Sequence, residues 1–527
     1  MIKKVNNVFS RKDVKVTSFF CGINKLQVIE MDGKIRRADV SLEKNIAYIE
    51  KRFERCSDVV HQKMMIAKKS YPVYVVYMDS MIDRDIVEGF ILKSLMYQLN
   101  DVPSENPVKY IRDCGVLSAD VKMLTDMEEI ITEILSGNTA IFGENSGQVI
   151  VIDSKSFPNR GVQAAETEVT VRGPKDSFTE SVRSNTILIR RRIRDTRLKS
   201  EQIKLGVRTK TDVALMYMDD LVQPDVLEEI KKRLKSFTVD SILDSGSLEQ
   251  FIEKKWYSPF PQFQSTERPD KAAASIMEGR IAVIVDNSPM VLLLPTVLSC
   301  FFQAADDYYN RWGIVFFTRI LRYAAALIAM ALPGFYIAAA TYHPEIFPTS
   351  LALSLAASRQ GVPFGLAVEV LLMELAFELL REAGIRLPGS MGSALGIVGG
   401  LIIGQAAVDA NIVSPVVVIV VALTALASFT IPNEAFASAF RLIKFSLILS
   451  GAFFGILGFT FGMLAVLIHL SGLESFGVPY LLPYGVSGLN PDEDFKDSIT
   501  RFPLFTMKKR PVFTRKNARR RMDFKKR

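Results

Sequence analysis

Charged side chains are distributed very unevenly along this chain, and their distribution divides it into a water-soluble part and a membrane part. Asp, Glu, Lys and Arg number 89 in residues 1–311, 14 in residues 312–471 and 19 in residues 472–527. The middle segment is apolar enough to lie in lipid. We therefore expect a multi-domain protein in which a soluble α/β domain precedes an all-α, multi-pass transmembrane domain.

The remaining charge places both soluble parts in the cytosol. The net charge is +8, and nearly all of it lies in the tail 472–527, where the positive-inside bias places cytoplasmic residues. We interpret this tail as a topology signal and an anchor to anionic lipid rather than as a nucleic-acid arm. No apolar core follows Lys3 and Lys4, so we predict no secretory signal and a cytosolic N-terminal domain.

The cysteines and histidines are few and scattered. The chain has four cysteines and three histidines, and none of them has metal-ligand or disulfide spacing. No nucleophile and base accompany the motifs described below. We therefore expect no catalytic residue, no metal and no cofactor.

The soluble part contains an internal repeat. The segment Tyr77–Glu88 matches Tyr217–Glu228 at five identical positions, and Ile134–Phe142 matches Ile276–Ile284 further along. Each copy indicates a strand, a turn and a helix, followed by a helix that ends at a glycine and a strand that ends at an Asn-Ser turn. Two matches in the same order favour duplication over chance. The expected divisions are an N-terminal segment (1–69), a first α/β module with an Arg-rich connector (70–209), a second module (210–311), the transmembrane domain (312–471) and the basic tail (472–527).

Two shorter segments of the soluble part have the composition of candidate binding sites. The apolar and basic stretch Ile187–Arg194 is interpreted as a solvated helix face that pairs with acidic neighbours, and a site for an anionic partner is the alternative. Gly143–Gly147 lacks the lysine and the spacing of a phosphate-binding loop and indicates a hairpin turn.

The membrane part contains four stretches that are long and apolar enough to span a bilayer. They cover residues 314–340, 391–410, 413–431 and 442–470. An even number of spans returns the chain to the cytosol, although Arg441 and Lys444 then lie near the outer mouth. The segment 344–386 carries too many charges to face lipid. We expect it to be a re-entrant or interfacial element.

Acidic residues in that element are candidates for an ion path. Glu374, Glu378 and Arg381 lie on one helix face, so one interpretation is an internal ion pair that neutralises the site. The other is a ring of carboxylates from several subunits along a cation path, because ionisable groups at membrane depth are functional by default. Both remain open. The candidate ion-path residues are Glu369, Glu374, Glu378 and Asp409, the last of which could instead be a helix cap.

Small residues form a regular series within the second stretch. Gly392, Gly396, Gly400 and Gly404 recur at every fourth position. Such a series produces a smooth groove on one helix face and allows close helix packing in lipid. We expect these glycines to pack helices, within or between subunits, and the glycines of the last span are plausible partners.

Several short motifs occur in a fixed order and together carry a resemblance. They are Arg172-Gly173-Pro174, Thr266-Glu267-Arg268-Pro269-Asp270, Gly279-Arg280, Asp286 with Pro289, Asp307-Tyr308-Tyr309 and Pro432-Asn433-Glu434. With them, the chain resembles the A-subunit family of GerA-type spore germination receptors from about residue 70 to 515.

The resemblance implies a location and a set of partners. In that family the A subunit lies in the inner membrane of bacterial endospores, with a cytosolic N-terminal domain. It works with a transporter-like B subunit that senses nutrients and a C-subunit lipoprotein, and its oligomers form a nutrient-gated ion channel. The stage V sporulation protein AF branch, a channel-like relative that amplifies germination, belongs to the same family.

We therefore expect a non-enzymatic membrane protein whose homo-oligomer, in contact with membrane lipid, conducts monovalent cations when a partner binds nutrient. The motif residues are expected to form a structural joint that transmits motion. The alternatives are an AF-type channel, a secondary transporter with a midplane site, and a membrane-anchored scaffold without a conducting path. No nucleic-acid partner is expected.

Overall fold

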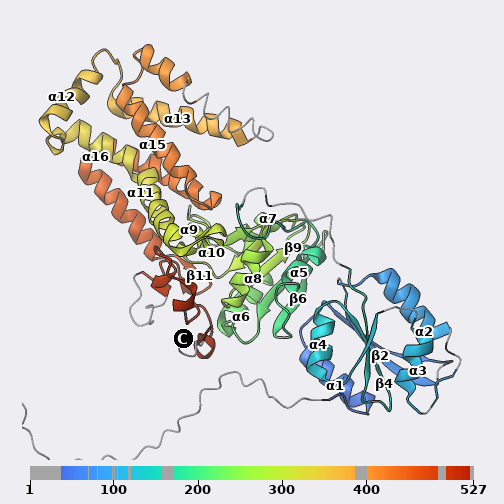
Figure 1. Ribbon diagram of the computed structural model, residues 1–527. Helices are drawn as coiled ribbons and strands as arrows, with labels where there is room; N and C mark the ends of the chain where they lie inside the picture. The colour runs from blue at the N-terminus through green and yellow to red at the C-terminus, as the bar shows by residue number, and fades with distance from the viewer. Residues whose placement is uncertain are drawn as a thin grey trace, which may run out of the picture.

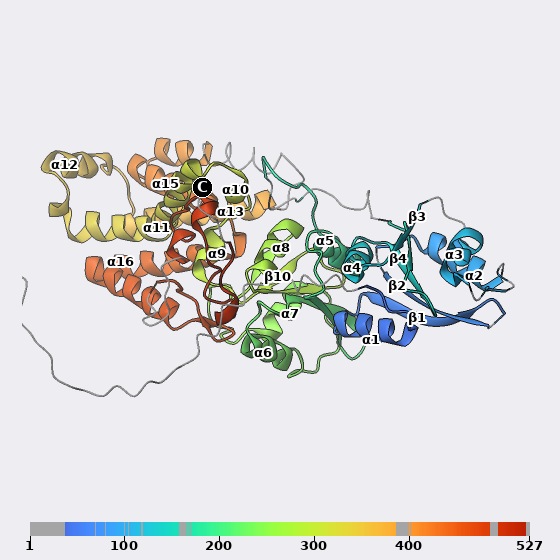
Figure 2. The same cartoon turned by 60° about the horizontal axis from the view of Figure 1, so that its bottom comes forward.

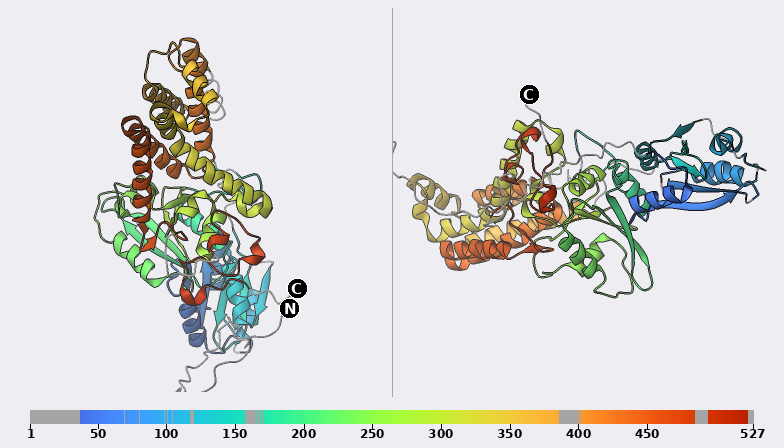
Figure 3. Two further views of the ribbon diagram at one scale, coloured as in Figure 1. Left: turned by 90° about the vertical axis from the view of Figure 1, so that its left-hand side faces the viewer. Right: turned by 90° about the horizontal axis from the view of Figure 1, so that it is seen from below.

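The computed structural model describes residues 37–522, apart from 69, 80, 98, 100, 104, 117–119, 157–164, 166–167, 169, 386–399, 401 and 485–493. Two α/β modules and a helical bundle follow one another along an elongated molecule (Figure 1). The same order, from module one through module two to the bundle, is visible from other sides in Figures 2 and 3.

Module one is a five-stranded antiparallel sheet with helices on both faces. Its strands lie in the order β1-β2-β4-β5-β3, and apolar clusters fill both sides of the sheet. The helix α1 and the strand β1 come before residue 70, so the module begins earlier than the predicted boundary. Its elements are α1 (Leu42–Arg52), β1 (Val59–Ile66), β2 (Tyr71–Met78), η1 (Asp85–Leu92), α2 (Lys93–Tyr97), α3 (Pro107–Tyr110), η2 (Ile111–Gly115), β3 (Val121–Leu124), α4 (Met127–Leu135), β4 (Thr139–Gly143) and β5 (Val149–Ile152).

Module two has the same strand order, β6-β7-β9-β10-β8. Taken in this order, the five strands of module two correspond one to one with β1, β2, β4, β5 and β3 of module one. The module includes α5 and β6, which lie before the predicted boundary at residue 210. Its elements are α5 (Val182–Arg190), β6 (Leu198–Leu205), β7 (Thr211–Met218), α6 (Pro224–Leu234), α7 (Ser245–Ile252), β8 (Gln264–Thr266), α8 (Pro269–Met277), β9 (Ile281–Val285) and β10 (Val291–Leu294).

The helix ends and turns that recur in both modules are formed by the predicted glycine and asparagine residues. Gly137 and Gly279 have φ of 95° and 89°, so each ends its helix in the left-handed region that glycine tolerates best. Asn145 and Asn287, at φ 57° and 65°, make the turns that follow β4 and β9. The glycine helix ends and asparagine turns predicted for both copies are therefore confirmed.

The contact between the modules corrects the interpretation of the connector. Arg190 is 1% exposed, and its guanidinium donates hydrogen bonds of 2.6 and 2.9 Å to Asp58 of module one. A solvated helix face was therefore the wrong expectation at this residue, although the expected acidic neighbour is present. Charge alone could not reveal the burial, because the partner lies in the other module.

The helical bundle follows module two. Its elements are α9 (Leu298–Phe302), α10 (Asp306–Tyr309), α11 (Trp312–Tyr342), η3 (Pro344–Ile346), α12 (Thr349–Ser358), α13 (Leu366–Ile385), the helical residues 402–409, α15 (Pro415–Phe429) and α16 (Glu434–Ser471). We call the end beside α9 and α10 the near end and the end beside η3 and α12 the far end. Among the described residues, α11 and α16 are long and apolar enough to cross a membrane, by length and composition.

The element α16 is a helical hairpin rather than one straight helix. Gly455 has φ 58° and ψ −144°, which breaks the helix. A Cβ on Gly462 would lie 3.1 Å from Ser450 Oγ, whereas twelve residues of continuous helix span about 18 Å. Phe260 also contacts both arms, at 5.9 Å from the ring of Phe436 and 6.1 Å from that of His469. Residues 434–454 therefore run to the far end and residues 456–471 return.

The hairpin corrects the expected last span, 442–470. Gly334 of α11 packs against Leu447 and Gly451, and the Tyr342 hydroxyl donates a 2.6 Å hydrogen bond to the carbonyl of Ala452. The first arm therefore runs parallel to α11. Arg441 lies on the near-end half of that arm, and Lys444 lies near its middle. The apolar pattern could not distinguish one long helix from two arms joined at a glycine.

The basic tail folds back onto module two. The short elements β11 (Glu474–Ser475), β12 (Val478–Pro479), η4 (Asp494–Lys496), η5 (Leu504–Thr506) and η6 (Lys516–Ala518) lie along it. Val512 and Phe513 belong to the apolar core of module two, and the Arg515 amide donates a 2.8 Å hydrogen bond to the carbonyl of Leu221. Part of the tail is thus a structural component of that module, which its charge did not indicate.

Candidate functional site

A column of ionisable side chains runs along α13 inside the helical bundle. Glu374 is 2% exposed and forms an ion pair with Lys444 on the first arm of α16. Lys444 also lies 3.5 Å from Glu378, one turn nearer the near end. Burying a charged side chain is costly unless an opposite charge pairs with it. The ion pair between Glu374 and Lys444 meets this requirement and neutralises the middle of the column. One oxygen of Glu374, Oε1, is buried without a hydrogen-bond partner among the described residues.

The near end of the column is a network between α13 and α16. Glu434 Oε1 accepts hydrogen bonds from Arg381 at 2.7 Å and from Arg441 at 3.1 Å. Arg441 lies 3.6 Å from Glu378. Of the two interpretations left open, the internal ion pair is present, but Arg381 is not the residue that supplies its positive charge. Arg381 pairs across the interface, and α16 supplies the cations that face Glu374 and Glu378.

The far end of the column is capped by a third glutamate. Glu369 is fully buried; its Oε2 accepts a 2.9 Å hydrogen bond from the Ser414 amide at the start of α15. Its Oε1 lies 3.3 Å from Arg359 Nε, in the turn after α12. A carboxylate at a helix N-terminus satisfies a free amide and suits the helix dipole. Glu369 thus holds α12, α13 and α15 together.

Asp409 does not join these three glutamates. Its side chain is exposed and accepts a 3.0 Å hydrogen bond from Gln405, one turn earlier in the same helix. The structure therefore brings three of the four predicted ion-path residues into one column, and Asp409 lies apart from it.

Two of the predicted packing glycines lie outside the described residues, namely Gly392 and Gly396. The other two face different neighbours. A Cβ on Gly400 would lie 3.2 Å from the ring of Phe377 on α13, and one on Gly404 would lie 3.1 Å from Val418 on α15. Each glycine leaves room for a neighbouring helix of the same chain. Packing between subunits stays a prediction.

The motif residues meet at a joint between module two and the bundle. The ring of Tyr309 packs so closely against Gly173 that a side chain on Gly173 would clash with it. The Tyr309 hydroxyl donates a 2.5 Å hydrogen bond to Asp270. Arg268 is 1% exposed and donates hydrogen bonds of 2.8 Å to Asp270 and to the carbonyl of Pro174. Although burial acts to raise it, the hydrogen bonds from Arg268 and Tyr309 lower the pKa of Asp270. Three motifs far apart in the chain therefore meet in one contact around the buried Arg268.

The other motif residues have local structural roles. Thr266 Oγ1 accepts a 3.1 Å hydrogen bond from the Arg268 amide, and Pro269 is the first residue of α8, where its fixed φ suits the start of a helix. The Glu267 carbonyl accepts a 2.7 Å hydrogen bond from the Phe178 amide. Asp286 accepts a 3.0 Å hydrogen bond from the Val182 amide at the start of α5. Arg172 is exposed, and Pro289 lies in the turn before β10.

Arg280 lies inside the core of module two and binds the bend in the chain at the end of β10. Its side chain is 3% exposed, and its nitrogens donate hydrogen bonds of 2.8 and 3.1 Å to the carbonyls of Pro295 and Leu293. It also bonds Gln264 Oε1 at 2.7 Å and Thr296 Oγ1 at 2.6 Å. This arginine therefore fixes the exit of β10 toward the bundle.

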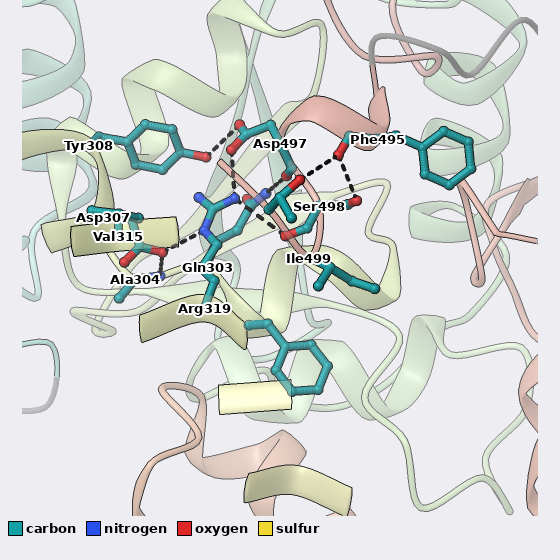
Figure 4. Close-up of polar contacts among 12 residues, drawn as sticks. Gln303, Ala304, Asp307, Tyr308, Val315, Arg319, Phe495, Asp497, Ser498 and Ile499 are labelled. Carbon is teal, nitrogen blue, oxygen red and sulfur yellow. Dashed lines mark hydrogen bonds and ion pairs between the residues drawn. The ribbon is translucent and has the colours of Figure 1, made fainter. Parts of the chain in front are cut away.

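A second buried contact lies where α11 begins (Figure 4). Arg319 is fully buried and donates hydrogen bonds of 2.9 Å to Asp307 and 2.7 Å to Asp497 of the tail. Burial raises the pKa of Tyr308 well above its ordinary value, so its hydroxyl remains protonated and donates a 3.0 Å hydrogen bond to Asp497. Arg319 thus ties the first long helix, the α10 turn and the tail together.

The sequence interpretation missed Arg319, Asp497 and the role of Lys444. A basic residue within a long apolar stretch is the available signal, since a buried charge needs a partner. The partner itself could not be read from spacing. Within the described ranges, no group of three or more His, Cys, Asp or Glu side chains is arranged to hold a metal ion.

Comparison with known proteins gives a consistent set of relatives. The family profile described as Bacillus/Clostridium GerA spore germination protein matches residues 47–513. The chain is 40% identical to spore germination protein KA of Bacillus subtilis (strain 168), over 89% of this chain and 86% of that protein. It is 36% identical to spore germination protein GerLA of Bacillus cereus, over 91% and 97%. It is 38% identical to the uncharacterized membrane protein YfkQ of Bacillus subtilis (strain 168), over 93% and 94%.

Among solved structures, the chain matches the crystal structure of the N-terminal domain of the A subunit of the Bacillus megaterium spore germinant receptor GerK3. The two are 30% identical, and the match covers 49% of this chain and 96% of that chain, with a TM-score of 0.38.

Proposed function

The chain belongs to the Bacillus/Clostridium GerA family of spore germination proteins, and we propose that it is a germinant-receptor A subunit whose homo-oligomer conducts monovalent cations across the spore inner membrane. A partner subunit would bind the nutrient, and its binding energy would shift the oligomer from a closed to an open state. The observation that carries the proposal is the column of glutamates and basic residues inside an otherwise apolar bundle.

The directions of the helices support a multi-pass arrangement. Six described segments run alternately between the near and far ends: α11, α13, residues 402–409, α15 and the two arms of α16. Glu369 contacts the far-end start of α15, whereas Arg381 contacts Glu434 at the near end, so α13 runs the full distance. We therefore propose α13 as a crossing segment in place of the re-entrant element. The hairpin keeps the number of crossings even.

An even number of crossings agrees with a cytosolic tail. The tail packs on module two through Val512 and Phe513, so both must lie on the same side of the membrane. We propose that this side is the cytosol, because the tail carries the excess of Lys and Arg.

The soluble modules support a role in assembly. Their common strand order and matching glycine and asparagine turns support an origin by duplication. We propose that the modules hold neighbouring subunits in register and transmit the signal of the B and C subunits to the bundle. Arg268, Asp270 and Tyr309 join module two to the start of α11 and are the direct structural route.

The test is cation conductance of the purified chain in a lipid bilayer, alone and together with its B and C subunits. We compare the chain with Glu378→Gln, which removes a charge from the column, and with Glu345→Gln, an exposed control beyond the far end of α11. Currents reduced several-fold by the first change and unaltered by the second would support the ion path. Currents unaffected by Glu378→Gln would overturn it, and absence of current from folded, complete receptor would favour the scaffold.

A further inference from the structure

The loop between α7 and β8 exposes two aromatic side chains on the surface of module two. Trp256 is 82% exposed and Tyr257 is 61% exposed, and their rings meet edge to face at 6.1 Å. Large apolar side chains exposed together usually mark an interaction site. The neighbouring Lys254 lies 3.6 Å from Glu474, so the loop carries little free charge there.

This loop is fastened to the end of the returning arm of α16. Ser258 Oγ and His469 Nε2 are hydrogen-bonded at 2.9 Å, and the Tyr257 ring lies 6.2 Å from the His469 ring. The ammonium of Lys255 donates a hydrogen bond to the carbonyl of Gly472, just past the last turn. The two exposed aromatic rings therefore lie at the level where α16 leaves the bundle.

The apolar surface continues from the loop onto the helix. Leu464, Leu467 and Ile468 on the last turns of the returning arm are 50%, 54% and 62% exposed. Toward the hairpin tip, Leu457 and Phe461 extend this surface with exposed fractions of 66% and 68%. An apolar face of this length is stable only when lipid or protein covers it.

We propose that Trp256 and Tyr257 insert into the headgroup region of the lipid bilayer and thereby hold module two in direct contact with the membrane surface. Trp and Tyr concentrate at this depth, because one part of each ring system is apolar and the other part forms hydrogen bonds with water and headgroups. The inference rests on the proposed membrane insertion of α11 and α16. It adds that a loop of the soluble domain, remote in sequence from the helices, is a lipid-contacting element.

The position of the other tryptophan provides an internal reference. The chain has two tryptophans, and Trp312 is the first residue of α11, at the near end, with 54% of its surface exposed. Trp312 therefore reports on the start of α11, whereas Trp256 reports on the end of the second arm of α16.

The test uses tryptophan fluorescence of the full chain reconstituted in lipid vesicles. Trp312→Phe leaves Trp256 as the only reporter, and Trp256→Phe leaves Trp312. Phospholipids brominated near the headgroup end of the acyl chain quench tryptophans in the interface, and those brominated near the chain end quench deeper ones. We expect Trp256 to be quenched more strongly by the shallow bromines than by the deep ones, and to be poorly quenched by aqueous acrylamide.

A variant without both tryptophans but with Tyr97→Trp is the matched control, because Tyr97 is 76% exposed on module one, away from the bundle. It should be quenched by acrylamide and not by brominated lipid. Quenching of Trp312 but not Trp256 by lipid would overturn the surface contact alone, whether acrylamide reaches Trp256 or a partner protein covers it. If lipid quenches neither, the proposed membrane insertion fails as well.

Discussion

Lys444 on the first arm of α16 pairs with Glu374 on α13, and both side chains are almost completely buried. The pair is the only contact in which two nearly buried, opposite charges meet between these two helices among the described residues. A buried charge left without its partner is much less stable than the pair or an apolar replacement of both.

We therefore predict strong coupling between these two positions. Lys444→Met and Glu374→Leu should each destabilise the protein by about 3–5 kcal/mol, whereas the double variant should recover most of the loss. Thermal unfolding in detergent measures the three variants against the parent. Additive losses in the double variant would contradict a direct pair.

The hairpin in α16 predicts a disulfide that a straight helix could not form. A Cβ on Gly462 would lie 3.9 Å from Ser450 Cβ, within the usual disulfide range of about 3.5–4.5 Å. In a chain with its native cysteines replaced by alanine, Ser450→Cys with Gly462→Cys should oxidise readily. Mass spectrometry of the linked peptides detects the bond.

The control for this disulfide moves one cysteine to the other face of the arm. Leu464 is 50% exposed, so Ser450→Cys with Leu464→Cys should remain reduced under the same conditions. Equal oxidation of the two pairs would show unspecific contact, and failure of the first pair to oxidise would refute the hairpin.

How far the sequence predicts the structure depends on the range of the interactions involved. Gly137 and Gly279 act through their own backbone, and their roles followed from local pattern. The turn at Gly455 did not, because several glycines in that apolar stretch are equally able to adopt positive φ and only packing against Tyr342 selects one. The partners of Arg190 and Arg319 lie more than a hundred residues away, in Asp58 and Asp497, where no periodicity reaches.

The Arg319 contact predicts a graded series of stability losses. Asp307 is 2% exposed and binds both Arg319 and Arg322, so Asp307→Asn should cost about 3–5 kcal/mol. Asp497 is 23% exposed on its side chain, and Asp497→Asn should cost less, about 1.5–3 kcal/mol, as for a hydrogen bond to a charged group. Asp497→Asn should also release the tail, which limited trypsin digestion would detect.

Lys508→Arg is the control for the tail, because Lys508 is exposed and arginine keeps the trypsin cleavage site. It should alter neither unfolding temperature nor digestion rate. A tail equally protected in the Asp497→Asn variant and the parent would show that the apolar contacts of Val512 and Phe513 suffice to hold it.

The buried position of Glu278 predicts that a rise from acidic to neutral pH weakens the packing of the tail on module two. It lines a cavity of about 60 Å³ with Asp494, Asp497 and Arg521, and burial, followed by the charge of Asp497, raises its pKa from 4.5 to about 7. Between these two values the folded state binds more protons than the unfolded state, so stability falls as pH rises through this window and stays low above it. Glu278→Gln should therefore unfold like the parent below pH 4.5 and be more stable above pH 7, by at most about 3 kcal/mol at ~1.4 kcal/mol per pH unit. Unfolding curves over this range measure the difference, with the exposed Glu129→Gln as control. A constant offset between Glu278→Gln and the parent at every pH would rule out titration of Glu278 as the cause.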